Sequence, residues 1–583
     1  MHNREQAYPN QLTETSIQSP YHRWILSAAL GLIVVVMLVP RLLALDRLVV
    51  VDETFWLGRS ANFYKALASG DFADTYQFVH PGVPLMWFGT LGYMLSYPTY
   101  PSEQESQLSP VRPPIVETLR RLGHDPLQML IAERRIKILG DTLILLIAFW
   151  MATRVLGLGV AVLGFCLLAL EPFVIAHARL LHVDALVSSF MMLSVLALLA
   201  YQRCGNRRRD LVISGMAAGL AWLTRSPALI LIPYTGLMFL LDFWLNRRGE
   251  RRFMHGLLRP LLQTFLLWFT AAATVTFALW PALWVQPVDT ATSIIEWAYD
   301  AATEGHERST FFLGKIIANG DPGWLFYPVS YLWRATPVTL LGLLLAVLGL
   351  ALCRTRIIPP SLRRPLVQLL LFALLFMACM SLGAKKFDRY ILPSYLPLNL
   401  VAAAGWYGVL RTARRARFHL APIIALAIAG LIMVAQGLSA ISAYPYYLSY
   451  YNPLLGGTRS ADRAVLVGWG EGMDQVASFI KAQPDGADAV VRTDAWREPL
   501  IFYLPNTIYT DIFPPNDDGK RRWMHTDYFV TYVTMWQRDT VSPALQHYLD
   551  QQRPVLTVTI DGLVYARVYD LRRIPVPEWY FHG

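Results

Sequence analysis

Two adjacent carboxylates follow the first long apolar stretch of the chain and are its strongest candidates for chemistry. Asp52 and Glu53 stand in the segment LVVVDETFW. Charged side chains at the edge of a membrane-spanning segment are costly, so they mark candidate functional sites. One carboxylate can act as a general base toward a hydroxyl group, while the other orients it or binds a cation. An ordinary helix end in water is the alternative interpretation.

A second polar motif precedes a later apolar stretch. The segment HARLLHVD contains His182 and Asp184, and ALVSSFMMLSVLALLA follows it. Asp184 can cap the following helix, or it can join His182 and Asp52 in one site. His80 precedes a Pro-Gly turn, where a structural role and a substrate- or metal-binding role both fit.

Three groups of cationic residues stand at the same predicted membrane face as Asp52. Positive charge is disfavoured on the outer side of a membrane, so the three groups together predict a site for an anionic ligand. A phosphate joined to a lipid fits their charge and depth, although snorkelling to headgroups explains any one group. The residues are Arg134, Arg135, Arg225, Lys385, Lys386 and Arg389.

A polar loop at residues 281–334 contains a further candidate site. His306 and Glu307 follow Glu304 in the segment EGHE. An imidazole beside carboxylates can bind a divalent cation or relay a proton. The spacing matches no established metal signature, so a structural polar loop is an equally good interpretation and metal dependence stays open.

The composition indicates whether the chain is soluble or embedded in a membrane. Of the 583 residues, 55% are hydrophobic and only 16% are charged, and the mean hydropathy is +0.37. A soluble chain carries about 25% charged residues, so the sequence predicts a polytopic α-helical membrane protein. The net charge of +10 reflects Arg-rich clusters between apolar stretches. Such clusters orient membrane helices, and we expect no binding to nucleic acid.

Eleven apolar stretches are candidates for membrane-spanning helices, each of which needs about 20 residues. With the N-terminus in the cytoplasm, all Arg-rich clusters lie on the cytoplasmic side, as the positive-inside rule requires. The stretches are 24–45, 136–153, 155–176, 185–202, 211–224, 227–245, 257–280, 335–352, 366–383, 390–410 and 420–442.

This orientation divides the chain into three parts. Residues 1–23 are predicted to be a cytoplasmic tail, and 24–442 a membrane module with outer loops at 46–135 and 281–334. Short alternating runs in residues 443–583 predict a small extracytoplasmic α/β domain. The chain has no Asn-x-Ser/Thr acceptor, which fits a prokaryotic plasma membrane better than a secretory compartment.

The order of the motifs resembles that of the GT-C glycosyltransferases that use polyprenyl- or dolichyl-phosphate-linked sugars. Within that superfamily the chain is most similar to the protein O-mannosyltransferase and aminoarabinose-transferase group, the family 39 type. The resemblance covers roughly residues 24–480 and implies a GT-C fold with about eleven transmembrane helices. Besides the two acidic motifs, it rests on GLAWLTRSPALILIP, PALWVQP, EGH…FFLG, KKFDRYILP and YYNPLLGG…VGWGEGMD.

The resemblance also implies roles for single residues. Asp52 matches the essential acidic residue of the family's first loop, with Glu53 beside it, and Asp184 matches the second acidic position. Arg225 stands where the family is expected to have a lysine. The implied reaction moves a monosaccharide from a polyprenyl-phosphate carrier to an acceptor hydroxyl of a protein, lipid or glycan. It is an inverting single displacement outside the cytoplasm.

A multi-pass transporter or flippase of a lipid-linked or anionic substrate is the alternative function. Transporters place charged residues near the bilayer midplane and often contain an inverted repeat, and the sequence shows neither. A scaffold protein would not need acidic and basic residues gathered at one membrane face. The sequence does not specify the sugar, the acceptor, the oligomeric state or the task of the C-terminal domain.

Overall fold

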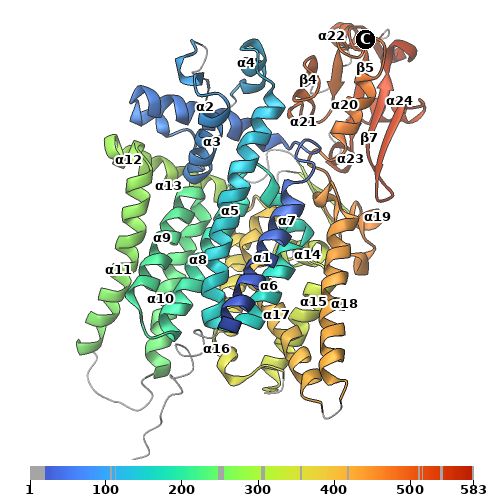
Figure 1. The fold of residues 1–583 in the computed structure, drawn as a ribbon. Coiled ribbons are helices and arrows are strands. Elements are labelled where there is room, and N and C mark those ends of the chain that lie inside the picture. The colour runs from blue at the N-terminus through green and yellow to red at the C-terminus, as the bar shows by residue number, and fades with distance from the viewer. Residues whose placement is uncertain are drawn as a thin grey trace, which may run out of the picture.

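A bundle of long helices, with shorter elements gathered at one end, makes up the computed structural model (Figure 1). We call this end of the bundle the capped end. It carries α2 (Val51–Ser69), α3 (Val83–Ser96), α4 (Ile115–Arg121) and a C-terminal unit formed by residues 458–580. The described residues are 20–104, 108–109, 111, 113–246, 255–303, 309–318, 320–354, 357–416, 419–509, 513–514, 516–538 and 542–580.

Among the described residues, six helices are long and apolar enough to cross a membrane. The chain is therefore a multi-pass integral membrane protein. Two bent helix pairs raise the number to eight if each counts as one span: α6 (Leu158–Ala169) with α7 (Pro172–Arg179), and α14 (Phe326–Arg334) with α15 (Pro337–Ala351). The six lie in α5 (Pro126–Leu156), α8 (Val183–Arg203), η3 (Ser226–Ile230) with α10 (Leu231–Asn246), α11 (His255–Leu279), α16 (Pro360–Leu382) and α18 (Ala421–Ser442).

The eleven predicted stretches all contain helix, but the described residues supply six to eight long spans. Helix α9 (Arg208–Thr224) has 17 residues and α15 has 15. At about 1.5 Å per residue, both are shorter than the roughly 30 Å hydrocarbon core. The stretch 155–176 is divided because the chain bends by 67° between α6 and α7. The first and tenth stretches correspond to α1 (Pro20–Leu42) and α17 (Leu392–Arg414).

Helix α8 lies at the centre of the bundle. The apolar stretch of α8 is completely buried, and the helix packs against α5, α9 and α17. A helix that is apolar on every side is stable in a protein core or in lipid, and the burial of α8 shows that it belongs to the core. Its first residues, Val183 and Asp184, consequently enter the site from inside the bundle.

Apart from α13, which has 17 residues, the remaining elements outside the C-terminal unit are short and lie between longer helices in the chain. They are η1 (Phe72–Thr75), η2 (Tyr100–Ser102), α12 (Ala282–Val285), α13 (Pro287–Thr303), β1 (Thr310–Phe312), β2 (Lys315–Ile317), η4 (Asp388–Ile391), η5 (Tyr447–Ser449) and η6 (Pro453–Leu455).

The C-terminal unit contains a mixed five-stranded sheet in the order β4-β3-β5-β7-β6. Strand β3 (Val491–Thr493) is parallel to β4 (Thr507–Tyr509) and β5 (Tyr528–Tyr532), whereas β7 (Leu563–Asp570) is antiparallel to β5 and to β6 (Leu556–Ile560). Strand β5 is buried along its whole length, as a central strand must be. The helices are α19 (Thr458–Ala461), α20 (Met473–Lys481), α21 (Glu498–Ile501), α22 (Asp517–Met524), α23 (Val533–Arg538), α24 (Pro543–Asp550), η7 (Leu571–Arg573) and η8 (Glu578–Tyr580).

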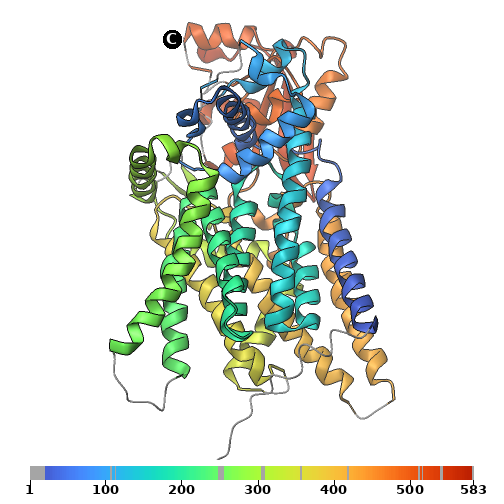
Figure 2. The same ribbon diagram turned by 60° about the vertical axis from the view of Figure 1, so that its left-hand side comes forward.

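The C-terminal unit lies beside the helices of the capped end (Figures 1 and 2), and polar contacts fasten it there. The Tyr503 hydroxyl donates to the carbonyl of Asp46 at 2.7 Å. Arg497 forms an ion pair with Glu117 on α4 at 2.9 Å, and Arg120 donates to the backbone carbonyl of Ile501. These contacts bring residues separated by several hundred positions to one surface, beside the N-terminus of α2.

We predict that close glycine packing between α9 and α11 stabilises the bundle. A Cβ atom at Gly219 would lie 2.3 Å from the carbonyl oxygen of Ala272, so Gly219→Ala must separate the two helices. We expect it to lower the free energy of unfolding by about 1–3 kcal/mol, measured by thermal unfolding in detergent. Gly236→Ala is the control, since no atom lies within 4 Å of its Cβ position. Equal stability of both variants would contradict the prediction.

Candidate active site

Two neighbouring carboxylates in the first turn of α2, Asp52 and Glu53, point in different directions. The N-cap residue of α2, Val50, has extended backbone (φ −108°, ψ 160°), and its N–H donates to the Glu53 side chain at 3.0 Å. This contact satisfies an N–H group at the start of the helix. Glu53 is consequently fully buried in the core, whereas the side chain of Asp52 is 27% exposed.

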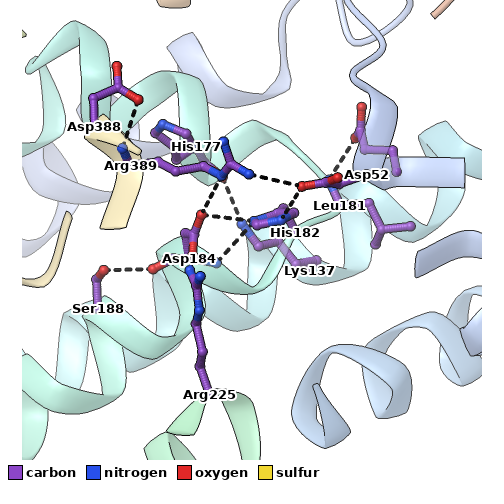
Figure 3. A network of polar contacts seen from close by, with 11 residues as sticks. Asp52, Lys137, His177, Leu181, His182, Asp184, Ser188, Arg225, Asp388 and Arg389 are labelled. Atoms are coloured by element: carbon purple, nitrogen blue, oxygen red, sulfur yellow. Dashed lines mark hydrogen bonds and ion pairs between the residues drawn. The ribbon is translucent and has the colours of Figure 1, made fainter. Parts of the chain in front are cut away.

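Asp52 is held by two groups from distant segments (Figure 3). Its Oδ2 atom lies 3.0 Å from Nε2 of His182 and 3.4 Å from Nη2 of Arg389. His182 directly precedes α8, and Arg389 lies in η4 before α17. Three segments far apart in the sequence therefore meet at one carboxylate.

Asp184 occupies the other side of the same imidazole (Figure 3). Its Oδ2 atom lies 3.1 Å from Nδ1 of His182 and 3.4 Å from Nε of Arg389, and its Oδ1 accepts from Arg225. His182 and Arg389 thus each bridge the two carboxylates. The N-cap of α8 is His182, whose Nδ1 lies 3.4 Å from the backbone nitrogen of Asp184. Asp184 itself is therefore not the cap.

The charges around Asp52 keep it ionised. Burial by itself raises the pKa of Asp52, but the hydrogen bond with His182 and the charge of Arg389 outweigh burial and the repulsion from Asp184, and lower the pKa to about 2. Burial lowers the pKa of His182, yet the carboxylates of Asp184 and Asp52 raise it above its ordinary value. These shifts stabilise the ionised carboxylate of Asp52 and favour the protonated form of the His182 imidazole.

Asp52 opens into a cavity of about 640 Å³ at the capped end. Its walls come from α2, the ends of bundle helices, the segment before η4 and the C-terminal unit. Among the residues predicted from the sequence, the cavity is lined by Asp52, His80, His182, Arg225, Lys385, Lys386 and Arg389. Asp184 contacts three of these side chains from behind. The structure thus brings Asp52, Asp184 and Arg225 into one network.

Glu53 and Arg134 form a buried ion pair outside the cavity lining. Nε of Arg134 donates to Oε1 of Glu53 at 2.7 Å, and the same oxygen accepts from the N–H of Leu181 at 2.7 Å. Both side chains are at most 2% exposed. The pair therefore fixes the residues directly before His182. Neither Glu53 nor Arg134, both predicted as site residues, is among the side chains that line the cavity.

The other predicted cations differ in their surroundings. Helix α9 ends at Thr224, and Arg225 follows in extended conformation, with its guanidinium 4.1 Å from the ring centroid of Tyr390. Lys386 forms an ion pair with Asp321. Arg135 is exposed on α5 and is not among the lining residues. The cationic wall of the cavity therefore consists of Arg225, Lys385, Lys386 and Arg389, together with residues not predicted from the sequence.

His80 lines the cavity as a neutral ring. Burial is the main reason that its pKa lies well below the ordinary value, and the charges of Arg225 and Arg59 lower it further. His306 and Glu307, the other predicted metal or substrate ligands, lie outside the described residues.

No group of three or more His, Cys, Asp and Glu side chains is arranged to hold a metal ion in the part of the chain that the structure describes. Between Asp52 and Asp184, the space that a shared cation would need is filled by the His182 ring and the Arg389 guanidinium. The carboxylates are neutralised by these two side chains.

Several lining residues were missed by the sequence analysis. Arg59 lies two helical turns after Asp52, on the same face of α2. That spacing could have identified it. Trp469 also lines the cavity and stands in the motif VGWGEGMD. Arg334, which pairs with Asp388 at 2.8 Å, and Arg538 have no such signal, because tertiary packing alone brings their segments to the cavity.

The segment that contributes the centre of the network matches a known protein family. Residues 128–284, which include His182, Asp184 and Arg225, match the family model described as dolichyl-phosphate-mannose-protein mannosyltransferase. The chain resembles the GT-C glycosyltransferases. The match confirms the resemblance predicted from the sequence and supports a glycosyltransferase. No curated protein matches the chain.

Solved glycosyltransferase structures are similar to the chain over most of its length. ArnT from Cupriavidus metallidurans, bound to undecaprenyl phosphate, is 14% identical with a TM-score of 0.46, covering 94% of this chain and 98% of ArnT. The Archaeoglobus fulgidus oligosaccharyltransferase, tethered to an acceptor peptide, is 11% identical with a TM-score of 0.48, covering 95% and 74%. The mycobacterial arabinofuranosyltransferase AftD is 12% identical with a TM-score of 0.37, covering 94% and 40%.

We predict that Glu53 stabilises the fold through its buried ion pair. Glu53→Gln leaves the charge of Arg134 without its partner inside the core, so we expect a loss of about 3–5 kcal/mol in the free energy of unfolding. Glu117→Gln is the matched control, since its pair with Arg497 is partly exposed and is worth about 0–1 kcal/mol. Thermal unfolding in detergent measures both. An equal loss of stability in the two variants would show that the buried ion pair contributes no more than the partly exposed one.

Proposed function

We propose that the chain is a membrane glycosyltransferase that moves a monosaccharide from a polyprenyl-phosphate carrier to an acceptor hydroxyl. One observation carries the proposal: the partly exposed carboxylate of Asp52 shares a cavity with the cations Arg225, Lys385, Lys386 and Arg389. A base for the acceptor and a binding site for an anionic leaving group are thus adjacent. The matching family model supports the same class of donor, since its description names dolichyl-phosphate-mannose.

In the proposed reaction, Asp52 removes the proton of the acceptor hydroxyl as its oxygen attacks the anomeric carbon. The bond from that carbon to the phosphate oxygen breaks on the opposite side, and the phosphate leaves with the bonding electrons. Attack from the opposite face inverts the configuration in a single displacement. The cations stabilise the charge that grows on the phosphate. His182 and Arg389 keep Asp52 ionised and fixed in direction, and Asp184 holds these two side chains in place.

We assign the reaction to the extracytoplasmic face. The cavity lies at the capped end, which contains the segments 46–135 and 443–583 that the positive-inside rule places outside. On this proposal, residues 24–442 form the catalytic module, residues 1–23 stay in the cytoplasm and residues 443–583 form an outer domain. The membrane would be a prokaryotic plasma membrane, and the acceptor a protein, lipid or glycan.

We predict that Asp52→Asn abolishes most transfer without unfolding the protein. Removal of a general base costs about 10²- to 10⁴-fold in rate, and the amide has nearly the same shape as the carboxylate. The assay measures transfer of radiolabelled mannose from dolichyl or undecaprenyl phosphate to endogenous acceptors in membranes. Undiminished transfer by the variant would refute the base assignment. Movement of intact lipid-linked label across vesicles, without cleavage, would favour a transporter or flippase.

We predict that Lys385→Ala weakens binding of the donor phosphate. A charge-assisted hydrogen bond contributes about 1.5–3 kcal/mol, so the donor KM should rise roughly 10- to 100-fold. Lys385 lines the cavity and is partly exposed, so its removal should leave the fold intact. Arg521→Ala in the C-terminal unit, where Arg521 is 73% exposed, is the control. An unchanged donor KM in Lys385→Ala would remove this residue from the phosphate site.

A further inference from the structure

The loop Gly468–Met473 of the C-terminal unit contacts the acidic network directly. The guanidinium of Arg389 lies 4.3 Å from the ring centroid of Trp469. The same indole meets the His182 ring edge to face, with 5.7 Å between centroids, and lies 6.1 Å from the ring of His177. Arg389 and His182 are the two side chains that bridge Asp52 and Asp184. A residue of the C-terminal unit therefore contacts both bridges.

Buried hydrogen bonds fix the position of Trp469. Its backbone N–H donates to Oε2 of Glu471 at 2.6 Å, and this carboxylate is 1% exposed. The Tyr532 hydroxyl lies 3.1 Å from the same oxygen and accepts from the N–H of Gly470 at 2.9 Å. Tyr532 belongs to the central strand β5, so the loop is anchored to the rigid sheet of the C-terminal unit.

The loop is also packed tightly against the segment that leads into α2. Gly470 has φ +128°, and a Cβ atom there would lie 2.3 Å from the carbonyl oxygen of Val49. Only glycine fits both the backbone conformation and the space. Val49 is three residues before Asp52, so the loop lies against the carboxylate's own segment as well as against its partners.

We propose that the C-terminal unit is part of the catalytic centre, with Trp469 as the positioning residue that holds Arg389 and His182 against Asp52 and Asp184. The inference rests on the proposed function and adds a task for the C-terminal unit. A guanidinium over an aromatic face is attracted by the ring quadrupole. Without the indole, Arg389 is free to extend into the cavity, and His182 loses one wall of its pocket.

The proposal concerns geometry, so its signature differs from that of a residue that only supports folding. Loss of Trp469 should lower kcat more than it raises the donor KM, because Asp52 is misdirected while Lys385 and Lys386 still bind phosphate. It should also raise the pKa of Asp52. The charged and titratable groups that face Asp52 are His182, Asp184, Arg389 and Arg59, and two of them contact Trp469. The acid limb of the pH–rate profile should therefore move to higher pH.

The test compares Trp469→Ala and Trp469→Phe with wild type in the full-length protein, using dolichyl-phosphate-linked radiolabelled mannose as donor. We expect kcat to fall about 3- to 30-fold in Trp469→Ala, in line with the strength of a cation–π contact, with recovery in Trp469→Phe. Trp579→Ala is the matched control, because Trp579 packs on Tyr548 in the same unit and is not among the cavity-lining residues.

A second measurement separates failure of this inference from failure of the proposed function. Purified protein is titrated with undecaprenyl phosphate, and the pH dependence of binding is compared between wild type and Trp469→Ala. A changed pH dependence in this variant alone, at unchanged thermal stability, supports the inference even if no tested donor is turned over. Identical kcat, pH profile and lipid binding in wild type and Trp469→Ala would overturn it. Absence of transfer by wild type would count against the proposed function instead.

Discussion

The bridging of two carboxylates by one imidazole and one guanidinium is the interaction on which the site depends. Asp52 and Asp184 repel each other, and their ionised forms are stabilised by His182 and Arg389, which lie between them, and at Asp184 also by Arg225. The partners come from α2, the start of α8 and η4, so the bundle must hold three distant segments in register. The complete burial of α8 and its packing against α17 provide this register.

A second set of buried charges supports the first without entering the cavity. Glu53 is adjacent to Asp52 in the chain, yet it pairs with Arg134 and accepts from the backbone of Leu181, directly before His182. The neighbouring carboxylates consequently have separate tasks: one faces the cavity, and the other fixes the loop that carries its imidazole partner. On the far side, the C-terminal unit closes the arrangement through Trp469. The network of Asp52 and Asp184 is therefore supported by buried side chains on both sides.

The cationic residues show that burial alone does not distinguish a cavity-lining cation from a structural ion pair. Arg134 and Arg225 are both buried and both pair with a carboxylate. Arg225 lines the cavity, whereas Arg134 is satisfied entirely within the protein. From the sequence, both residues were predicted to bind an anionic ligand, since each is a basic residue at the predicted outer end of a span. Their different uses follow from which side chains lie opposite them.

The sequence alone was sufficient to predict the membrane class, the position of most helical stretches and the two acidic motifs that begin α2 and α8. These features are visible because hydropathy and positive charge are local properties that the lipid environment imposes residue by residue. Only the tertiary structure decided that Glu53 and Arg134 satisfy each other, that His182 joins the two acids, and that Arg334 and Trp469 reach the cavity. Those contacts join segments tens to hundreds of residues apart, and their energies depend on distance and burial, which no local pattern records.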